Sequence, residues 1–120
     1  MAQDLRSFLE LIENKYADQF LRIKARVSST FDATALVLEA EKLASCPVVL
    51  FEKVEGSDFP VVSNILAHRP RLALALGVPG ERLVEEFRTR LKNSISPVIE
   101  SEAPFQENTL LGEDVDLTRL

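Results

Sequence analysis

Three polar residues near the middle of the chain could together bind an anion. Asn64, Arg69 and Arg71 lie where an apolar strand is expected to end and a helix to begin. Free N–H groups and positive side chains at a helix start attract phosphate or carboxylate groups. The more common alternative is that such residues cap the helix and face solvent, and we favour that alternative.

The other residues that could do chemistry stand alone. His68 is the only histidine and Cys46 the only cysteine. A histidine-based metal site or catalytic dyad would need distant partners that no sequence feature identifies. We therefore expect His68 to lie at the surface or to cap a helix, and Cys46 to be a small buried residue rather than a nucleophile.

Two pairs of carboxylates are too incomplete to predict a site. Asp114 and Asp116 are two residues apart, a spacing that could place both carboxylates on one hard cation. Two carboxylates without further oxygen ligands make only a weak site. Glu52 and Glu55 lie near a strand end without any sign of the pocket that a general acid needs. Gly56 belongs to a turn, since the chain has no GxGxxG or GxxxxGK[ST] pattern.

Composition indicates one folded domain. The chain has 120 residues, 46% of them hydrophobic, and a net charge of −5. Residues 101–120 contain five acids and one arginine, so −4 of that charge lies there and the first hundred residues are nearly neutral. With no basic surplus, nucleic-acid binding has no electrostatic support. The acidic amino terminus is unlike a signal peptide, and no apolar run reaches membrane-spanning length. A single cysteine is compatible with a reducing compartment. We therefore expect a cytoplasmic protein with no membrane partner.

The first half of the chain alternates helical and extended patterns. Asp4 is suited to cap a helix that ends near Lys15, with a stripe at Leu5, Phe8, Leu9 and Ile12. A strand follows, with Leu21, Ile23, Ala25 and Val27 facing the core and Arg22, Lys24 and Arg26 facing water. Asp32 is expected to cap a second helix, whose stripe is Leu36, Val37, Ala40, Leu43 and Ala44.

The central stretch, residues 47–77, is the most informative part of the sequence. Residues 48–51 form an unbroken apolar run that predicts a strand covered on both faces. Turn residues 55–58 and a second strand at 60–66 predict a hairpin or neighbouring strands. A short, almost wholly apolar helix should then begin near Pro70, end at Gly77 and be buried.

The last part of the chain has one helical stripe and then loses its period. The stripe comprises Leu83, Val84, Phe87 and Leu91. Residues 96–100 predict one edge strand, and residues 103–105 predict irregular chain laid on a surface. The otherwise polar tail contains three apolar residues, Val115, Leu117 and Leu120. Their presence indicates that the tail packs against another surface and that a domain boundary lies here. The whole pattern predicts an α+β fold, a single small domain with a mixed β-sheet flanked by helices.

Several segments together resemble a known family. They are DLRSFLELIE at the start, the LRI strand, PVVLFEKVEGSDFPVVSNILAHRPRLALALG in the middle and GEDVDLTRL at the end. In this order and spacing the chain resembles the amino-terminal domain of the UbiD-like decarboxylases, and the resemblance covers essentially its whole length.

The resemblance implies a reversible, non-oxidative decarboxylase of aromatic, heteroaromatic or α,β-unsaturated acids. Such enzymes use prenylated FMN with a divalent metal (manganese) and potassium. Family members bind these groups after the amino-terminal domain, and no position here matches their binding residues. The resemblance therefore implies no catalytic, cofactor-binding or metal-binding residue in this chain, which should be inactive alone.

The resemblance also implies an organisation and partners. Residues 1–100 would be the amino-terminal α+β domain, and residues 101–120 an acidic connector leading toward an absent cofactor-binding domain. The partners would be the cofactor-binding and carboxy-terminal domains of the same enzyme and, for the whole enzyme, a small aromatic or unsaturated acid. We expect the parent enzyme to be a homo-oligomer.

Two alternatives remain open at the level of sequence. The chain could be a stand-alone small accessory subunit of a multi-subunit carboxylase. It could instead be an unrelated binding module, which would predict a ligand pocket lined by Asn64, Arg69 and Arg71. We rank the enzyme domain first, the subunit second and the independent module last.

Overall fold

A three-stranded mixed sheet forms the centre of the fold. The computed structural model describes residues 4–101 and 109–116. The strands are β1 (Phe20–Val27), β2 (Val48–Val54) and β3 (Val61–Ser63), in the order β1-β2-β3. β1 runs parallel to β2, and β3 runs antiparallel to it. The expected α+β fold with a mixed sheet is confirmed.

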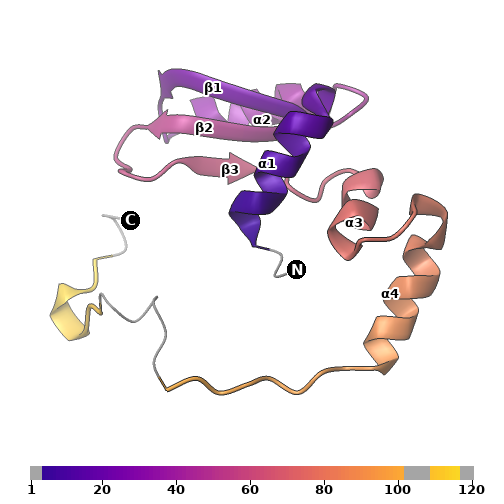
Figure 1. Ribbon diagram of the computed structural model, residues 1–120. Helices are drawn as coiled ribbons and strands as arrows, with labels where there is room; N and C mark the ends of the chain where they lie inside the picture. The colour runs from indigo at the N-terminus through magenta and orange to yellow at the C-terminus, as the bar shows by residue number, and fades with distance from the viewer. Residues whose placement is uncertain (1–3, 102–108, 117–120) are drawn as a thin grey trace.

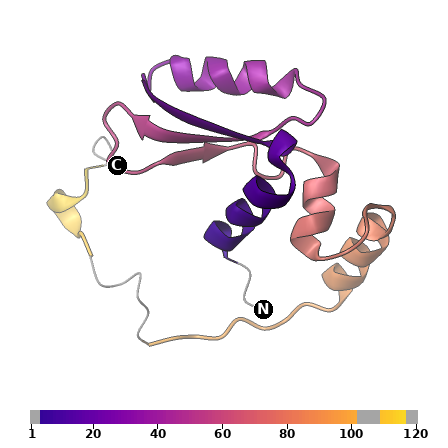
Figure 2. The ribbon, with the colours of Figure 1, turned by 45° about the horizontal axis from the view of Figure 1, so that its top comes forward.

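In the described ranges, four α-helices surround or extend this sheet. Their bounds are α1 (Leu5–Lys15), α2 (Asp32–Glu41), α3 (Arg69–Leu76) and α4 (Leu83–Lys92), with short 3-10 helices η1 (Ala17–Gln19), η2 (Gly80–Arg82) and η4 (Gly112–Asp114). α2 connects the two parallel strands and covers one face of the sheet, while α1 covers the other (Figures 1 and 2). α3 and α4 lie beyond the end of the sheet, on the side of α1.

β2 is the centre of two hydrophobic cores, one on each face. Val49 and Phe51 pack in the core beneath α2, and Val48 packs with Phe8 and Ile12 of α1. Each fully buried aliphatic or aromatic side chain contributes about 1.5–3 kcal/mol. The predicted strand with both faces covered is confirmed.

α1 forms where its sequence predicts. Asp4 is the N-cap, and its carboxylate accepts a hydrogen bond from the Ser7 backbone N–H at 2.9 Å and another from the Ser7 hydroxyl at 2.9 Å. These bonds lower the pKa of the Asp4 carboxyl below its ordinary value, because they stabilise its charged form. The predicted cap is confirmed. Phe8 and Ile12 are buried and Leu9 is half-buried, which confirms most of the predicted stripe, but Leu5 is exposed and its predicted burial is wrong.

β1 departs from the simple alternation that the sequence predicts. Val27 is buried and Ile23 half-buried, but Leu21 and Ala25 are exposed. Between Ile23 and Arg26 the register shifts, so that two residues of β1 lie opposite one residue of β2. Such an irregularity interrupts the period of two. The predicted burial of Ala25 is therefore wrong. That of Leu21 is also wrong, although Leu21 pairs with Val49 in the regular register before the shift.

The N-cap of α2 lies one residue earlier in the chain than expected. The N-cap position is Phe31, and Asp32 is the first helical residue and makes no cap bond. Val37 and Ala40 of the predicted stripe pack toward the sheet, together with Ala33. The rest of that stripe is wrong, because Leu36, Leu43 and Ala44 are exposed and the last two lie beyond the helix end at Glu41.

The central hairpin and α3 match the sequence in outline. Gly56 has a φ of +78° in the turn between β2 and β3, and Gly77 ends α3 with a φ of +69°, as glycine allows. The second strand is shorter than predicted, because Asn64 has a left-handed φ of +59° and ends it. The expected burial of α3 is confirmed only in part. Arg71 and Ala73 are buried and residues 74–76 are half-buried, but Leu72 is exposed.

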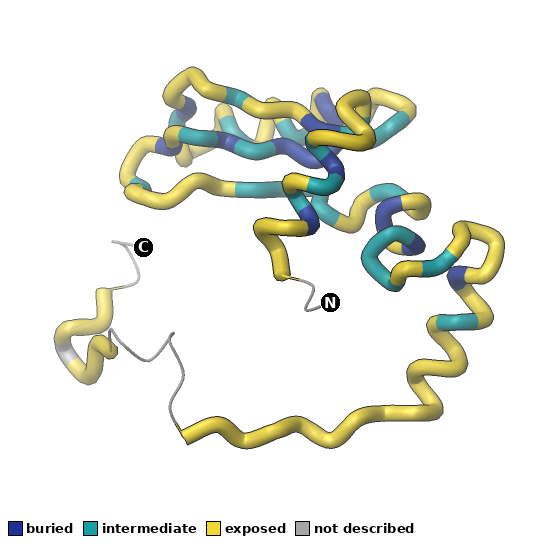
Figure 3. The backbone as a smooth tube through the Cα atoms, in the orientation of Figure 1, coloured by how far each residue is buried: buried dark blue, intermediate teal, exposed yellow. Residues whose placement is uncertain are grey.

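The segment after α4 is extended and packs on little. The predicted edge strand at 96–100 is wrong, since residues 93–100 have no regular secondary structure. Ile95 and Ile99 are each 94% exposed, and Figure 3 shows this stretch as exposed throughout. The predicted irregular chain at 103–105, and Leu117 and Leu120, lie outside the described residues. None of the described helices has the length and apolar character needed to cross a membrane.

Candidate functional site

Arg71 is the most unusual polar residue of the structure. Its side chain is 1% exposed at the start of α3. All five of its N–H groups donate to oxygens: Nε to the Ile65 carbonyl at 3.1 Å, Nη1 to the Gln19 side chain at 3.2 Å and the Ser45 carbonyl at 3.1 Å, and Nη2 to the Asn64 carbonyl at 3.0 Å and the Cys46 carbonyl. Four of these acceptors are backbone groups. Arg71 thus joins η1, the loop before β2 and the loop before α3.

The electrostatics of Arg71 follow from this burial. The five oxygen acceptors of its guanidinium are all uncharged groups. Loss of hydration lowers the pKa of the guanidinium from its ordinary value, although an arginine remains charged at neutral pH. Because every donor is already used, Arg71 has no N–H left for an anion. Both expectations for this residue, the anion site and the solvent-facing cap, are wrong.

The other two members of the predicted anion site do not form an anion site with Arg71, and Asn64 contacts it through a backbone carbonyl that accepts from Nη2. Asn64 takes the left-handed turn before α3, and its buried Nδ2 has no hydrogen-bond partner among the described residues. Arg69 is exposed and lines an open pocket of about 510 Å³. Neither Asn64 nor Arg71 lines that pocket. None of the four pockets described for residues 4–101 and 109–116 is lined by Asn64, Arg69 and Arg71 together, as the binding-module alternative predicted.

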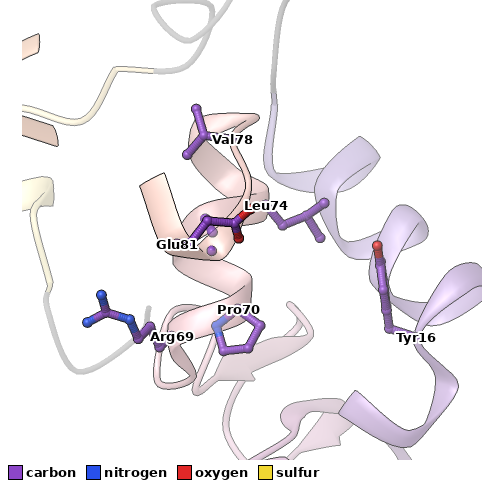
Figure 4. Close-up of a pocket in the computed structure, with 8 residues that line it drawn as sticks. Tyr16, Arg69, Pro70, Leu74, Val78 and Glu81 are labelled. Carbon is purple, nitrogen blue, oxygen red and sulfur yellow. The ribbon is translucent and has the colours of Figure 1, made fainter. Parts of the chain in front are cut away.

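The pocket beside Arg69 lies between the end of α1, α3 and η2. Figure 4 shows Arg69 on one side of Pro70 and Tyr16 on the other, with Glu81 and Val78 above them. One cation and one anion at an open, largely aliphatic surface do not make a nucleophile, a general base or a metal site. We assign no chemistry to it.

A surface network connects α1 to the sheet. Arg22 of β1 bonds both carboxylate oxygens of Glu13 at 2.7 Å and lies 3.1 Å from a carboxylate oxygen of Glu52. These bonds lower the pKa of Glu13 and raise that of Arg22. Glu52 therefore serves this network rather than a catalytic pair with Glu55. The sequence placed Arg22 on a solvated face and so missed its role, which depends on α1 lying across β1.

His68 and Cys46 have structural surroundings. His68 is the N-cap residue of α3, and its Nδ1 lies 3.3 Å from the Gln19 side-chain oxygen. The expected helix-capping position is confirmed, although its side chain makes no cap bond. Cys46 is a half-buried free thiol with a φ of +40°. No group of three histidine, cysteine or acidic side chains that could hold a metal exists in the described part of the chain, including Asp114 in η4.

A largely apolar hollow lies between α3 and α4. It measures about 700 Å³ and is lined by Leu66, Leu72, Ala75, Leu76, Leu83, Val84, Phe87, Arg88 and Leu91. α4 is held on α3 by Arg90, whose Nη2 donates to the Leu76 carbonyl at 2.9 Å. Leu83 is buried, but Phe87 and Leu91 remain 53% and 67% exposed. The sequence identified this stripe correctly but not its exposure. We call this surface the α3–α4 groove.

Comparisons with known proteins identify the domain. The family model for the 3-octaprenyl-4-hydroxybenzoate carboxy-lyase N-terminal domain matches residues 13–91. A curated relative, the phenolic acid decarboxylase of Streptomyces sp. (strain D7), is 36% identical over 121 residues. That alignment covers 95% of this chain and 25% of the relative. The chain thus spans about a quarter of the length of the relative.

Solved structures agree in fold. The vanillic acid decarboxylase of Sedimentibacter hydroxybenzoicus, in its closed form, superposes with a TM-score of 0.73 and 29% identity over 98% of this chain and 26% of that one. A second structure is an evolved dimeric form of the UbiD-class enzyme HmfF from Pelotomaculum thermopropionicum, in complex with prFMN. It superposes with a TM-score of 0.70 and 28% sequence identity, over 79% of this chain and 21% of that one. With a family model that covers more than half of its length, the chain belongs to the UbiD carboxy-lyase family, to its amino-terminal domain.

Proposed function

We propose that this chain is the non-catalytic amino-terminal domain of a reversible, non-oxidative decarboxylase. The substrates would be aromatic, heteroaromatic or α,β-unsaturated carboxylic acids. The observation that carries the proposal is the superposition of nearly the whole chain on about a quarter of a vanillic acid decarboxylase. The similar phenolic acid decarboxylase supports an aromatic acid as the first substrate class to test.

The proposed enzyme uses prenylated FMN, with manganese and potassium. The complex of HmfF with prFMN supports the flavin. The residues described here do not fit these groups, because Arg71 has no donor left for a flavin phosphate and no three potential metal ligands come together in the described ranges. The proposal therefore places the flavin and the metals in a part of the enzyme outside this chain, and it assigns no reaction step to a residue of this chain.

The proposal includes an organisation. Residues 1–100 are the domain proper, and residues 101–120 are an acidic connector to the cofactor-binding domain. The end of α4 at Lys92 and the extended chain after it support a boundary in this region. The domain packs beside the cofactor-binding domain and helps to shape or cover its entrance. The enzyme is cytoplasmic and homo-oligomeric.

The experiment that tests this function uses protein from its native source. Its intact mass and its absorbance spectrum are measured first, and then the release of carbon dioxide from a panel of aromatic and unsaturated acids. A polypeptide several times heavier than 13.4 kDa, with flavin absorbance and decarboxylation of at least one acid, is the expected result. A 13.4 kDa protein without flavin would overturn the proposal and favour an accessory subunit.

The isolated 120-residue chain is the second arm of this experiment. It should release no carbon dioxide from any acid of the panel, even when reconstituted with the flavin and manganese. Decarboxylation by the isolated chain would show that the domain has an active site of its own, contrary to the proposal.

A further inference from the structure

The α3–α4 groove exposes apolar side chains that a folded domain normally covers. Phe87 and Leu91 are more than half exposed, and Leu66 and Val84 are also exposed along the same hollow. Large contiguous apolar surfaces on soluble proteins usually mark an interaction site. Arg88 is the one charged side chain in the lining, so the groove suits an apolar occupant rather than an anionic ligand.

The described part of the chain does not supply that occupant. The segment directly after α4 contains three large apolar residues, yet Ile95 and Ile99 are 94% exposed and Val98 is also exposed. They cannot both cover the groove and remain open to solvent. Instead they extend the apolar surface beyond α4, and Leu110 and Leu111 of the next described segment are exposed as well.

We propose that the α3–α4 groove is the docking surface for the remainder of the same polypeptide, the cofactor-binding part of the enzyme. This inference rests on the proposed function and specifies which surface of the domain serves it. The chain spans a quarter of its curated relative, so about three quarters of such a protein is available as a covalently attached partner. A tethered partner has a high effective concentration, which favours it over a free one.

Two further observations favour this occupant. Exposed apolar residues continue from the groove along the segment that follows α4, which is the direction of the connection. The closed vanillic acid decarboxylase superposes on 98% of this chain, so nearly all of the extended segment has a counterpart in a full-length enzyme. A second copy of this chain is less suited, because a two-fold interface through the groove would bring two Arg88 side chains into one apolar contact.

Thiol labelling in the full-length enzyme tests this docking surface. Leu91→Cys places a thiol in the groove, and Phe59→Cys places one at the turn between β2 and β3, where the native side chain is 71% exposed. Both thiols are labelled under native conditions, and each is quantified by mass spectrometry of its peptide. A covered side chain reacts only when the contact opens, so the thiol at 91 should react at least about tenfold more slowly than that at 59.

The outcomes separate the possible occupants. Equal labelling rates in an enzyme that carries flavin would overturn the docking surface and leave the proposed function intact, whereas a protein without flavin and of 13.4 kDa would overturn both. In the isolated 120-residue chain the thiol at 91 should react as fast as that at 59. If it is instead protected there, increasingly so at higher protein concentration, the occupant is a second copy and the proposal is wrong.

A charge substitution provides a second readout. Phe87→Glu should lower the melting temperature of the full-length enzyme and leave that of the isolated chain nearly unchanged, because Phe87 is buried only in the former. Phe59→Glu is the matched control and should change neither. A full-length enzyme that tolerates Phe87→Glu as well as Phe59→Glu would contradict the proposal.

Discussion

α1 and α4 are amphipathic helices of 11 and 10 residues, and they differ in how much of the apolar face is buried. α1 lies across the sheet and buries Phe8 and Ile12, whereas α4 buries Leu83 and leaves Phe87 and Leu91 in solvent. Both sequences show the same helical spacing of apolar residues. The difference teaches that such a stripe predicts a face to be covered, but not that the covering surface belongs to the same domain.

α3 stands between these two regions, and Arg71 connects it to η1 and to the loop before β2. Of the substitutions considered, Arg71→Met should therefore have the largest effect on stability, since it leaves five acceptors without their donor. We expect a loss of about 3–5 kcal/mol in the free energy of unfolding of the 120-residue chain, measured with urea. Arg69→Met is the control, because this exposed side chain should change stability by less than about 0.5 kcal/mol. Equal losses for the two variants would show that the guanidinium network contributes little.

The two helices can be compared directly by truncating one side chain in each. Ile12→Ala should cost about 2–5 kcal/mol in the free energy of unfolding, because Ile12 is completely buried. Leu91→Ala should change the stability of the same chain by less than about 0.5 kcal/mol, since two thirds of that residue is already exposed. A similar loss in both variants would mean that the α4 face is covered in the isolated chain, and the contrast between the helices would disappear.

The connection from α3 to α4 offers a smaller effect. Gly77→Ala should destabilise the chain by about 1 kcal/mol, because a side chain at a φ of +69° is strained even where space is open. Gly80→Ala also meets open space but has no positive φ, so it should be neutral or slightly stabilising. Thermal unfolding of both variants checks this difference. If the two alanines have the same effect, the left-handed end of α3 is not what positions α4.

The cap of α1 should make its stability depend on pH. The pKa of Asp4 is lowered in the folded state by its bonds to Ser7, so the cap stabilises the chain fully above the ordinary value of 3.8 and is lost as the pH falls through the lowered folded value. Asp4→Asn keeps a capping side chain without this titration. The fall in melting temperature between pH 7 and pH 3 should therefore be smaller for Asp4→Asn. An equal fall would contradict the assignment.

Local signals in the sequence predicted much of the fold. The cap at Asp4, the unbroken run from Val48 to Phe51 and the pair of Pro70 and Gly77 each depend on neighbours a few residues away, and each was confirmed. Features set by distant parts of the chain were missed. The exposure of Ala25 accompanies a register shift against β2. The end of β3 at Asn64 was also missed, because a left-handed φ of +59° is uncommon for a residue other than glycine and was not predicted there.

The anion-site hypothesis for Arg71, and the favoured alternative of a solvent-facing helix cap, failed for the same reason. Arg71 looked like an anion ligand because its position at a helix start is visible in the sequence, but its five acceptors come from segments up to 52 residues away. No local sequence pattern predicts that the Gln19 side chain and the carbonyls of Ser45 and Cys46 all accept hydrogen bonds from one guanidinium. The absence of a recognisable catalytic motif led to a prediction of no site residue in this chain, and that remains a prediction.

The position of β1 at the edge of the sheet has a consequence for aggregation. β2 lies on one side of β1, and no described strand lies on the other. An open edge of this kind can recruit a strand from a second molecule and start an insoluble assembly. Lys24 and Arg26 are exposed on this strand, next to the irregular register. Because like charges on two such edges repel each other and an irregular strand pairs poorly, we expect these two basic residues to keep neighbouring molecules apart at high concentration.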